Sequence, residues 1–312
     1  MNDYTVKDNG DGTYDVAFAA DGIYYLVASD SDPILVPAVC QVEFNKLEEI
    51  EPIYKATGEY LAGLSTPTVG SINGEWRVIG LLRSGREVDE AYYNAVVSYV
   101  QSSINENEQL NSYKSTENSR LILALTAMGK DVTDVGGHNL LEGLTSMDYV
   151  TYQGINGAIF ALLAFDSHDY TIPKGDVTRE ALVDAILDAQ LADGGWTLSG
   201  TASDSDMTGM ALQALAPYYG KNTVVTTAVD KALAWLSDVQ LADGAFAGAD
   251  GVSAESLAQI ITGLTALGIN PEEDTRFIKN GISAVDALAE FYVEGGGFRH
   301  ILKGNLDMMA TE

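Results

Sequence analysis

A five-residue string that occurs twice constrains the fold of this chain more than any other feature. The string is Gln-Leu-Ala-Asp-Gly, found at Gln190–Gly194 and again at Gln240–Gly244. In both copies an amphipathic helical pattern leads into a glycine-containing turn that ends on an aromatic residue, Trp196 or Phe246. An identical string at a fixed period is typical of an architecture built by repeating one helical unit.

Two kinds of helix alternate from Asn45 onward. The first kind is apolar on all sides, which predicts burial on every face; it comprises Trp76–Leu82, Leu121–Met128, Ile155–Phe165, Met207–Ala216, Leu257–Leu267 and a sixth helix starting near Met308. The second kind is amphipathic and suits helices that cover the buried ones: Tyr92–Val100, Leu182–Gln190, Ala228–Val239 and Ile282–Tyr292. Six inner and six outer helices predict a mainly α fold, an α/α toroid over residues 45–312, with its last helix truncated at Glu312.

Strand patterns occupy residues 1–44 instead. Alternating apolar residues on either side of an Asp- and Gly-rich turn predict a hairpin, and Gly22–Val27 and Val36–Phe44 predict further strands. We expect a small separate β segment that resembles part of an immunoglobulin-like domain. The turn at 8–12 lacks the ligand spacing of a calcium loop, so we interpret it as an ordinary turn. Met1–Tyr4 resembles an expression start, and we expect a fragment cut at both ends.

Charge and cysteine content exclude several function classes. Lys and Arg number 17 against 45 Asp and Glu, a net charge of −28, and the basic footprint of a nucleic-acid-binding protein is missing. No apolar run approaches the ~20 residues of a membrane span. The single cysteine, Cys40, permits no internal disulfide, and the histidines His138, His168 and His300 lack metal-ligand spacing. We therefore expect no metal site and no cofactor.

The most pointed chemical signal is Asp204-Ser-Asp206-Met-Thr208, at the start of an inner helix. Two interpretations stay open. Neighbouring carboxylates shift each other's acidity and supply acid catalysts, whereas Asp and Ser also cap helix N-termini and favour the positive end of the helix dipole.

Acidic residues recur near the starts of the inner helices: Glu75, Glu117, Asp206, Glu255 and Glu312. If the inner helices are parallel, these acids gather around one mouth of the toroid. First-turn acids stabilise a helix by about 0.3–1 kcal/mol each, which explains them without a ligand. Beside aromatic residues, however, they also suit an apolar or cationic ligand through cation–π attraction. The candidate binding residues are Glu75, Trp76, Glu117, Tyr152, Trp196 and Glu255.

The repeated turns resemble a known motif. Leu236-x₃-Gln240-x₃-Gly244-x-Phe246 is similar to the glutamine–tryptophan repeat of squalene–hopene cyclases and other class II terpene cyclases. Ile186–Trp196 looks like a second copy, and Leu288–Phe298 looks like a degenerate third copy that has lost its glutamine. The resemblance covers about residues 45–312 and implies the toroid, a fold shared with prenyltransferase β subunits. In overall texture the chain is similar to terpene-cyclase-like modules of bacterial surface proteins, which implies an extracellular or cell-surface location.

The same resemblance bears on function. Asp204–Thr208 is similar to the Asp-x-Asp-Asp-Thr motif of class II cyclases, which would make Asp206 the general acid and Asp204 its helper, although Met207 replaces the third Asp. A zinc prenyltransferase is excluded because Cys40 lies outside the toroid and the three histidines lack metal-ligand spacing. We expect a cell-surface module that binds an apolar or cationic small molecule, or a surface protein, and does not catalyse a reaction. The alternative is an isomerase resembling class II terpene cyclases.

Overall fold

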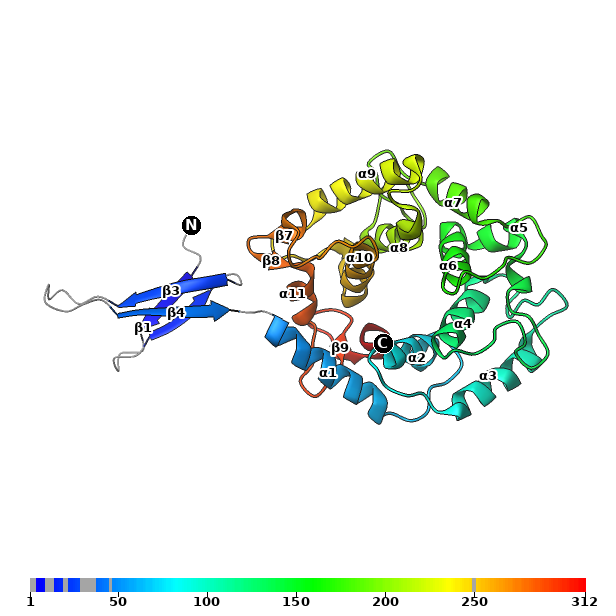
Figure 1. The fold of residues 1–312 in the computed structure, drawn as a ribbon, viewed down its shortest axis with the longest axis horizontal. Helices are drawn as coiled ribbons and strands as arrows, with labels where there is room; N and C mark the ends of the chain where they lie inside the picture. The colour runs from blue at the N-terminus through cyan, green and yellow to red at the C-terminus, as the bar shows by residue number, and fades with distance from the viewer. Residues whose placement is uncertain (1–3, 9–13, 19–21, 29–37, 45–46, 249–250) are drawn as a thin grey trace, which may run out of the picture.

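The computed structural model describes residues 4–8, 14–18, 22–28, 38–44, 47–248 and 251–312, and the described part is mainly helical (Figure 1). Six helices lie around a common centre: α2 (Trp76–Arg83), α4 (Thr116–Ala127), α6 (Ile155–Asp166), α8 (Ser205–Leu215), α10 (Ala254–Ala266) and α12 (Met308–Thr311). The helices outside them are α1 (Leu47–Gly63), α3 (Glu90–Ser103), α5 (Met147–Val150), α7 (Arg179–Asp188), α9 (Thr223–Val239) and α11 (Ala284–Ala289).

The inner helices contact one another in chain order and close a ring. In order, α2 packs against α4, α4 against α6, α6 against α8, α8 against α10 and α10 against α12. The ring closes because α12 contacts Ser71–Glu75, the segment directly before α2. Glycine permits the closest of these approaches because it carries no Cβ. A Cβ on Gly209 of α8 would lie 2.7 Å from the Gln259 carbonyl carbon in α10, and one on Gly263 of α10 would lie 2.7 Å from the Gly209 carbonyl oxygen.

The repeated glutamines hold the outer layer together. Gln190 Nε2 donates to the Gly194 carbonyl in its own turn (2.7 Å) and to the Ala228 carbonyl in α9 (2.8 Å). The second copy makes the same pair of bonds, from Gln240 Nε2 to the carbonyls of Gly244 (3.0 Å) and Phe277 (2.8 Å). Each glutamine therefore closes one turn and ties it to the outer segment that follows, which explains why the string repeats.

Glycines in the turns after α7, α9 and α11 carry positive φ angles, 104° at Gly194, 78° at Gly244 and 100° at Gly296. A Cβ on Gly194 would lie 2.8 Å from the Lys231 carbonyl oxygen in α9. A Cβ on Gly296 would lie 2.7 Å from the Ala56 carbonyl oxygen in α1. Gly296 thus packs against α1 as Gly194 packs against α9, and it brings the turn after α11 against α1, where the outer layer closes (Figure 1).

The positions of the apolar helices are confirmed, although α4, α8 and α10 each begin ahead of the predicted range. α4 begins at Thr116, ahead of its apolar run, because Asn118 in its first turn accepts the Leu110 N–H and donates to the Glu108 carbonyl, both in the preceding loop. The predicted helix Ile282–Tyr292 is wrong at both ends, since α11 spans only Ala284–Ala289. Residues 278–283 form the hairpin of β7 (Ile278–Lys279) and β8 (Ile282–Ser283), and Ser283 begins α11 through a capping box with Asp286.

The predicted hairpin near the N-terminus is confirmed, because β1 (Tyr4–Asp8) pairs antiparallel with β2 (Tyr14–Phe18). A second pair joins β3 (Gly22–Ala28) and β4 (Ala38–Phe44). Most of the Asp- and Gly-rich turn, residues 9–13, lies outside the described residues. The remaining strands are short antiparallel pairs within the helical part: β5 (Ala247–Gly248) with β6 (Gly251–Val252), and β9 (Phe298–Arg299) with β10 (Leu306–Asp307). Across the described ranges no helix combines the length and apolarity that crossing a bilayer requires.

Candidate functional site

Two pockets lie within the inner ring and share one wall. One pocket lies at the amino-terminal ends of the inner helices, is called the amino-end pocket and has a volume of about 450 Å³. The other lies at their carboxyl-terminal ends, is called the carboxyl-end pocket and has a volume of about 580 Å³. Trp76, Phe160 and Met210 line both, and the Trp76 and Phe160 ring centroids are 5.8 Å apart. Both volumes fall within the ~300–1,000 Å³ of ordinary small-molecule sites.

The lining shows that the inner helices run parallel. The amino-end pocket takes residues from the starts of four inner helices: Trp76, Thr116, Arg120, Asn156, Phe160, Asp204, Asp206 and Met207, with Leu198 and Met210. The carboxyl-end pocket takes residues from the last turns of the same helices, among them Arg83, Ala127, Ser167 and Gln213. The starts of α2, α4, α6 and α8 therefore lie together at one end of the ring. Of the five acids expected around that mouth, only Asp206 lines the pocket.

Asp204 and Asp206 both line the amino-end pocket. Asp204 is the N-cap of α8: its Oδ1 accepts the Met207 N–H (2.9 Å), and its Oδ2 accepts the Thr197 hydroxyl (3.0 Å). Asp206 sits half-buried in the first turn, where a Cβ on Gly248 would lie 2.8 Å from its Oδ2. Met207, at the position of a third carboxylate, is 6% exposed. The site therefore holds two carboxylates, one of which stabilises its own helix.

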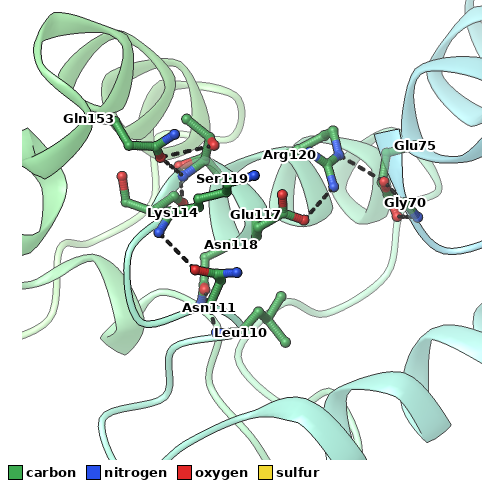
Figure 2. A network of polar contacts seen from close by, with 12 residues as sticks. Gly70, Glu75, Leu110, Asn111, Lys114, Glu117, Asn118, Ser119, Arg120 and Gln153 are labelled. Atoms are coloured by element: carbon green, nitrogen blue, oxygen red, sulfur yellow. Dashed lines mark hydrogen bonds and ion pairs between the residues drawn. The ribbon is translucent and has the colours of Figure 1, made fainter. Parts of the chain in front are cut away.

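Glu75 and Glu117 both pair with Arg120, which itself lines this pocket (Figure 2). Arg120 Nε lies 2.8 Å from Glu75 Oε2, and its Nη2 lies 2.6 Å from Glu117 Oε2. Glu75 is 1% exposed and also accepts the Gly70 N–H and the Tyr92 hydroxyl. Two acids on one arginine leave a negative excess, to which Asp204 and Asp206 add.

Burial acts against each charge in this network, and the partners offset it. Burial lowers the pKa of Arg120, but the hydrogen bonds that Arg120 donates to Glu117 and Glu75, with the negative charge of both acids, outweigh it and raise the pKa above the ordinary value. Burial raises the pKa of Tyr92, and the negative charge of Glu75 raises it further. Arg120 therefore stays charged and Tyr92 stays a hydroxyl donor throughout the physiological range.

Other residues predicted for the site lie away from both pockets. Trp196 is fully buried, and its indole N–H donates to the Ile186 carbonyl (2.7 Å), so it anchors the core under the repeated turn. Tyr152 is 67% exposed and its ring lies 5.7 Å from that of Tyr113. Glu255 contacts His300 Nδ1 at 2.8 Å. Of the predicted binding residues, only Trp76 faces a pocket directly.

The sequence pattern did not indicate several of the pocket residues. α6 begins with Ile155 and Asn156, and because it has no acid in its first turn, nothing marked Asn156 and Phe160 as site residues. Arg120 had a usable signal, because it follows Glu117 by three residues on the same helix face. The carboxyl-end pocket had none, since its residues belong to no short motif.

Within residues 47–248 and 251–312, His, Cys, Asp and Glu form no group that fits a metal ion. Comparison of the chain with models of protein families and with curated proteins gave no match. The function is therefore inferred from the geometry of the pockets.

Proposed function

We propose that residues 45–312 form an α/α toroid of the terpene-cyclase-like kind and that it binds a small organic cation with an apolar body, without catalysing a reaction. The alternation of inner and outer helices and the paired roles of Gln190 and Gln240 support the toroid. The β segment before it is, in this proposal, the end of an immunoglobulin-like domain.

The observation that carries the binding proposal is the composition of the amino-end pocket. Trp76 and Phe160 supply aromatic faces, and Asp204 and Asp206 supply negative charge on the same wall. A cation over an aromatic face gains about 0.5–2 kcal/mol, with more gained when water is excluded. Because Arg120 is held by Glu75 and Glu117, it does not cancel the charge of the two aspartates.

Titration with benzyltrimethylammonium and its neutral tert-butyl analogue, followed by calorimetry, tests this function. We expect the cation to bind at least tenfold more tightly than the neutral analogue. Asp206→Asn should weaken the cation about tenfold, while Asp184→Asn, which removes an exposed acid of α7 outside both pockets, should leave binding unchanged. Equal binding of the two ligands, or equal effects of the two variants, contradicts the proposal.

The second candidate is a cyclase that uses Asp206 as general acid, and the half-buried position of Asp206 on a pocket wall favours it. Two features weigh against the cyclase: Asp204 Oδ1 accepts the Met207 N–H, which engages the proposed helper of Asp206, and residue 207 is a methionine instead of a third carboxylate. Incubation with squalene-like substrates decides between them. Product formed by the natural chain and lost in Asp206→Asn would replace the binding proposal with the enzymatic one.

We also propose the cell-surface setting that the resemblance implies, in which a surface protein is a further possible partner. Labelling of intact cells with a membrane-impermeant reagent tests this location. Labelling that occurs only after lysis contradicts it.

A further inference from the structure

The carboxyl-end pocket has a chemistry opposite to that of the amino-end pocket. Its wall is apolar and only half-buried, formed by Ile79, Leu82, Leu123 and Leu163 together with the shared Trp76, Phe160 and Met210. Half-buried aliphatic groups around a space of about 580 Å³ gain free energy when an apolar body covers them.

The Arg and His side chains that line this pocket are basic. Arg83 and His168 stand at the rim, both exposed, and the lining includes neither Asp nor Glu among the described residues. This contrasts with a chain that has 45 acidic residues and 17 Lys and Arg. The guanidinium of Arg83 has no ion-pair partner within the part of the chain that the structure describes, whereas Arg120 at the other pocket is held by two.

The other polar groups at this end are largely engaged with one another. Gln213 Nε2 donates to Gln259 Oε1 (2.7 Å), and Thr126 Oγ1 lies 2.9 Å from the Tyr170 hydroxyl. Helix carbonyls are engaged as well, by the glycine N–H groups that follow α2 and α4: Gly85 to Leu82 (3.1 Å) and Gly129 to Thr126 (3.0 Å). Arg83 and His168 are therefore the side chains at this rim best placed to meet a charged group of a ligand.

We propose that the carboxyl-end pocket binds a single-chain aliphatic molecule with one anionic head group. The chain lies against the Leu82, Leu123 and Leu163 wall, and the head group lies at the rim beside Arg83 and His168. Charge complementarity selects the head group, and buried area sets the affinity. The two pockets share the wall of Trp76, Phe160 and Met210, but this proposal does not rest on the proposed function of the amino-end pocket.

Titration with straight-chain carboxylates of increasing length, each below its micelle concentration, tests the proposal. Each added methylene should tighten binding about fourfold, equivalent to ~0.8 kcal/mol, until the pocket is full. Dodecanoate should bind at least tenfold more tightly than dodecanol. Equal affinity for the acid and the alcohol, or affinity that does not change with chain length, overturns the proposal.

Three variants locate the site. Arg83→Gln should weaken dodecanoate about tenfold and leave dodecanol unchanged, while Lys221→Gln, which removes an exposed cation outside both pockets, should change neither. Ala127→Leu narrows the pocket and should shorten the chain length at which affinity levels off, with helix content unchanged by circular dichroism. Unaltered dodecanoate binding in Arg83→Gln together with an unaltered length limit in Ala127→Leu would rule this pocket out.

Two further measurements separate this site from its alternatives. Asp206→Asn should leave dodecanoate binding intact, so failure of the cation proposal does not affect this result. Flotation with phosphatidylglycerol vesicles distinguishes a free molecule from a membrane surface. Binding to the vesicles without binding of monomeric dodecanoate would replace the pocket with a lipid-surface interaction and overturn the proposal.

Discussion

Replacing Arg120 by Met should destabilise the helical part by about 3 kcal/mol. The substitution keeps an apolar stem of similar length but removes the charge that holds Glu75, whose side chain is 1% exposed. Removing one partner of a buried ion pair typically costs about 3–5 kcal/mol, because the other charge is left without compensation. The lower end applies here, since Glu75 keeps hydrogen bonds from the Gly70 N–H and the Tyr92 hydroxyl.

A double-mutant cycle separates this coupling from ordinary packing loss. In a Glu75→Gln background the same Arg120→Met change should cost about 1 kcal/mol, because no buried carboxylate is left uncompensated. Glu117→Gln alone should cost less than about 1 kcal/mol, since the Glu117 side chain is 25% exposed and Arg120 retains Glu75. Urea unfolding followed by far-ultraviolet circular dichroism measures the stability of the natural chain and of the four variants. If the cost of the double variant equals the sum of the Arg120→Met and Glu75→Gln costs within about 0.5 kcal/mol, the assignment of the buried pair is refuted.

Two further predictions concern ring closure and pH. Gly296→Ala should lower the free energy of unfolding in urea by about 3 kcal/mol, because φ is 100° and the new Cβ would lie 2.7 Å from the Ala56 carbonyl oxygen. The control Gly295→Ala, with φ at 97° and open space around its Cβ, should cost only the backbone strain of about 1–2 kcal/mol. Equal costs for the two variants would mean that the turn does not press on α1. Burial raises the pKa of Glu312 from 4.5 to about 7, so the folded state binds the proton more tightly and the free energy of unfolding should fall as pH rises from about 4.5 to 7. Glu312→Gln should flatten this fall by about 1–2 kcal/mol after allowance for solvent screening, and an unchanged pH profile in this variant would contradict the assignment.

Periodicity located the helices because it reports burial directly. α6 is apolar around most of its circumference, and the structure buries most of it, with Gly157, Ala158 and Ala161 letting its neighbours approach. Its remaining face, with Phe160 and Leu163, is half-buried and lines the pockets. The same reasoning failed at Ile282–Tyr292, where apolar spacing continues through a segment that Gly281 turns into a hairpin. The twofold pattern of a short hairpin and the start of a helix are indistinguishable over so few residues.

Among the predicted site residues, Asp204, Asp206 and Trp76 line the pockets. Glu75 and Glu117 also lie at helix starts, but they pair with Arg120 instead. Asp204 and Asp206 reach the pocket because a helix start fixes where the first turn points, but the sequence alone could not show that Asp204 bonds the Met207 N–H. Trp196 was an attractive pocket residue by type, yet its position after the repeated turn directs the indole into the core. Aromatic residues serve both roles, and only the backbone path distinguishes them.

The two ends of the ring differ because the inner helices are parallel. Every helix start contributes partial positive charge to the amino end, where acids are stabilising, and every helix end contributes partial negative charge to the carboxyl end, where Arg83 is stabilising. The charged side chains that stabilise the helix ends therefore make the amino-end pocket negative and the carboxyl-end pocket positive. Trp76 and Phe160 form the wall between them, so filling one pocket fixes rings that the other ligand must also contact. An apolar cation and an aliphatic anion bound at opposite ends should consequently affect each other's affinity equally, as linkage requires.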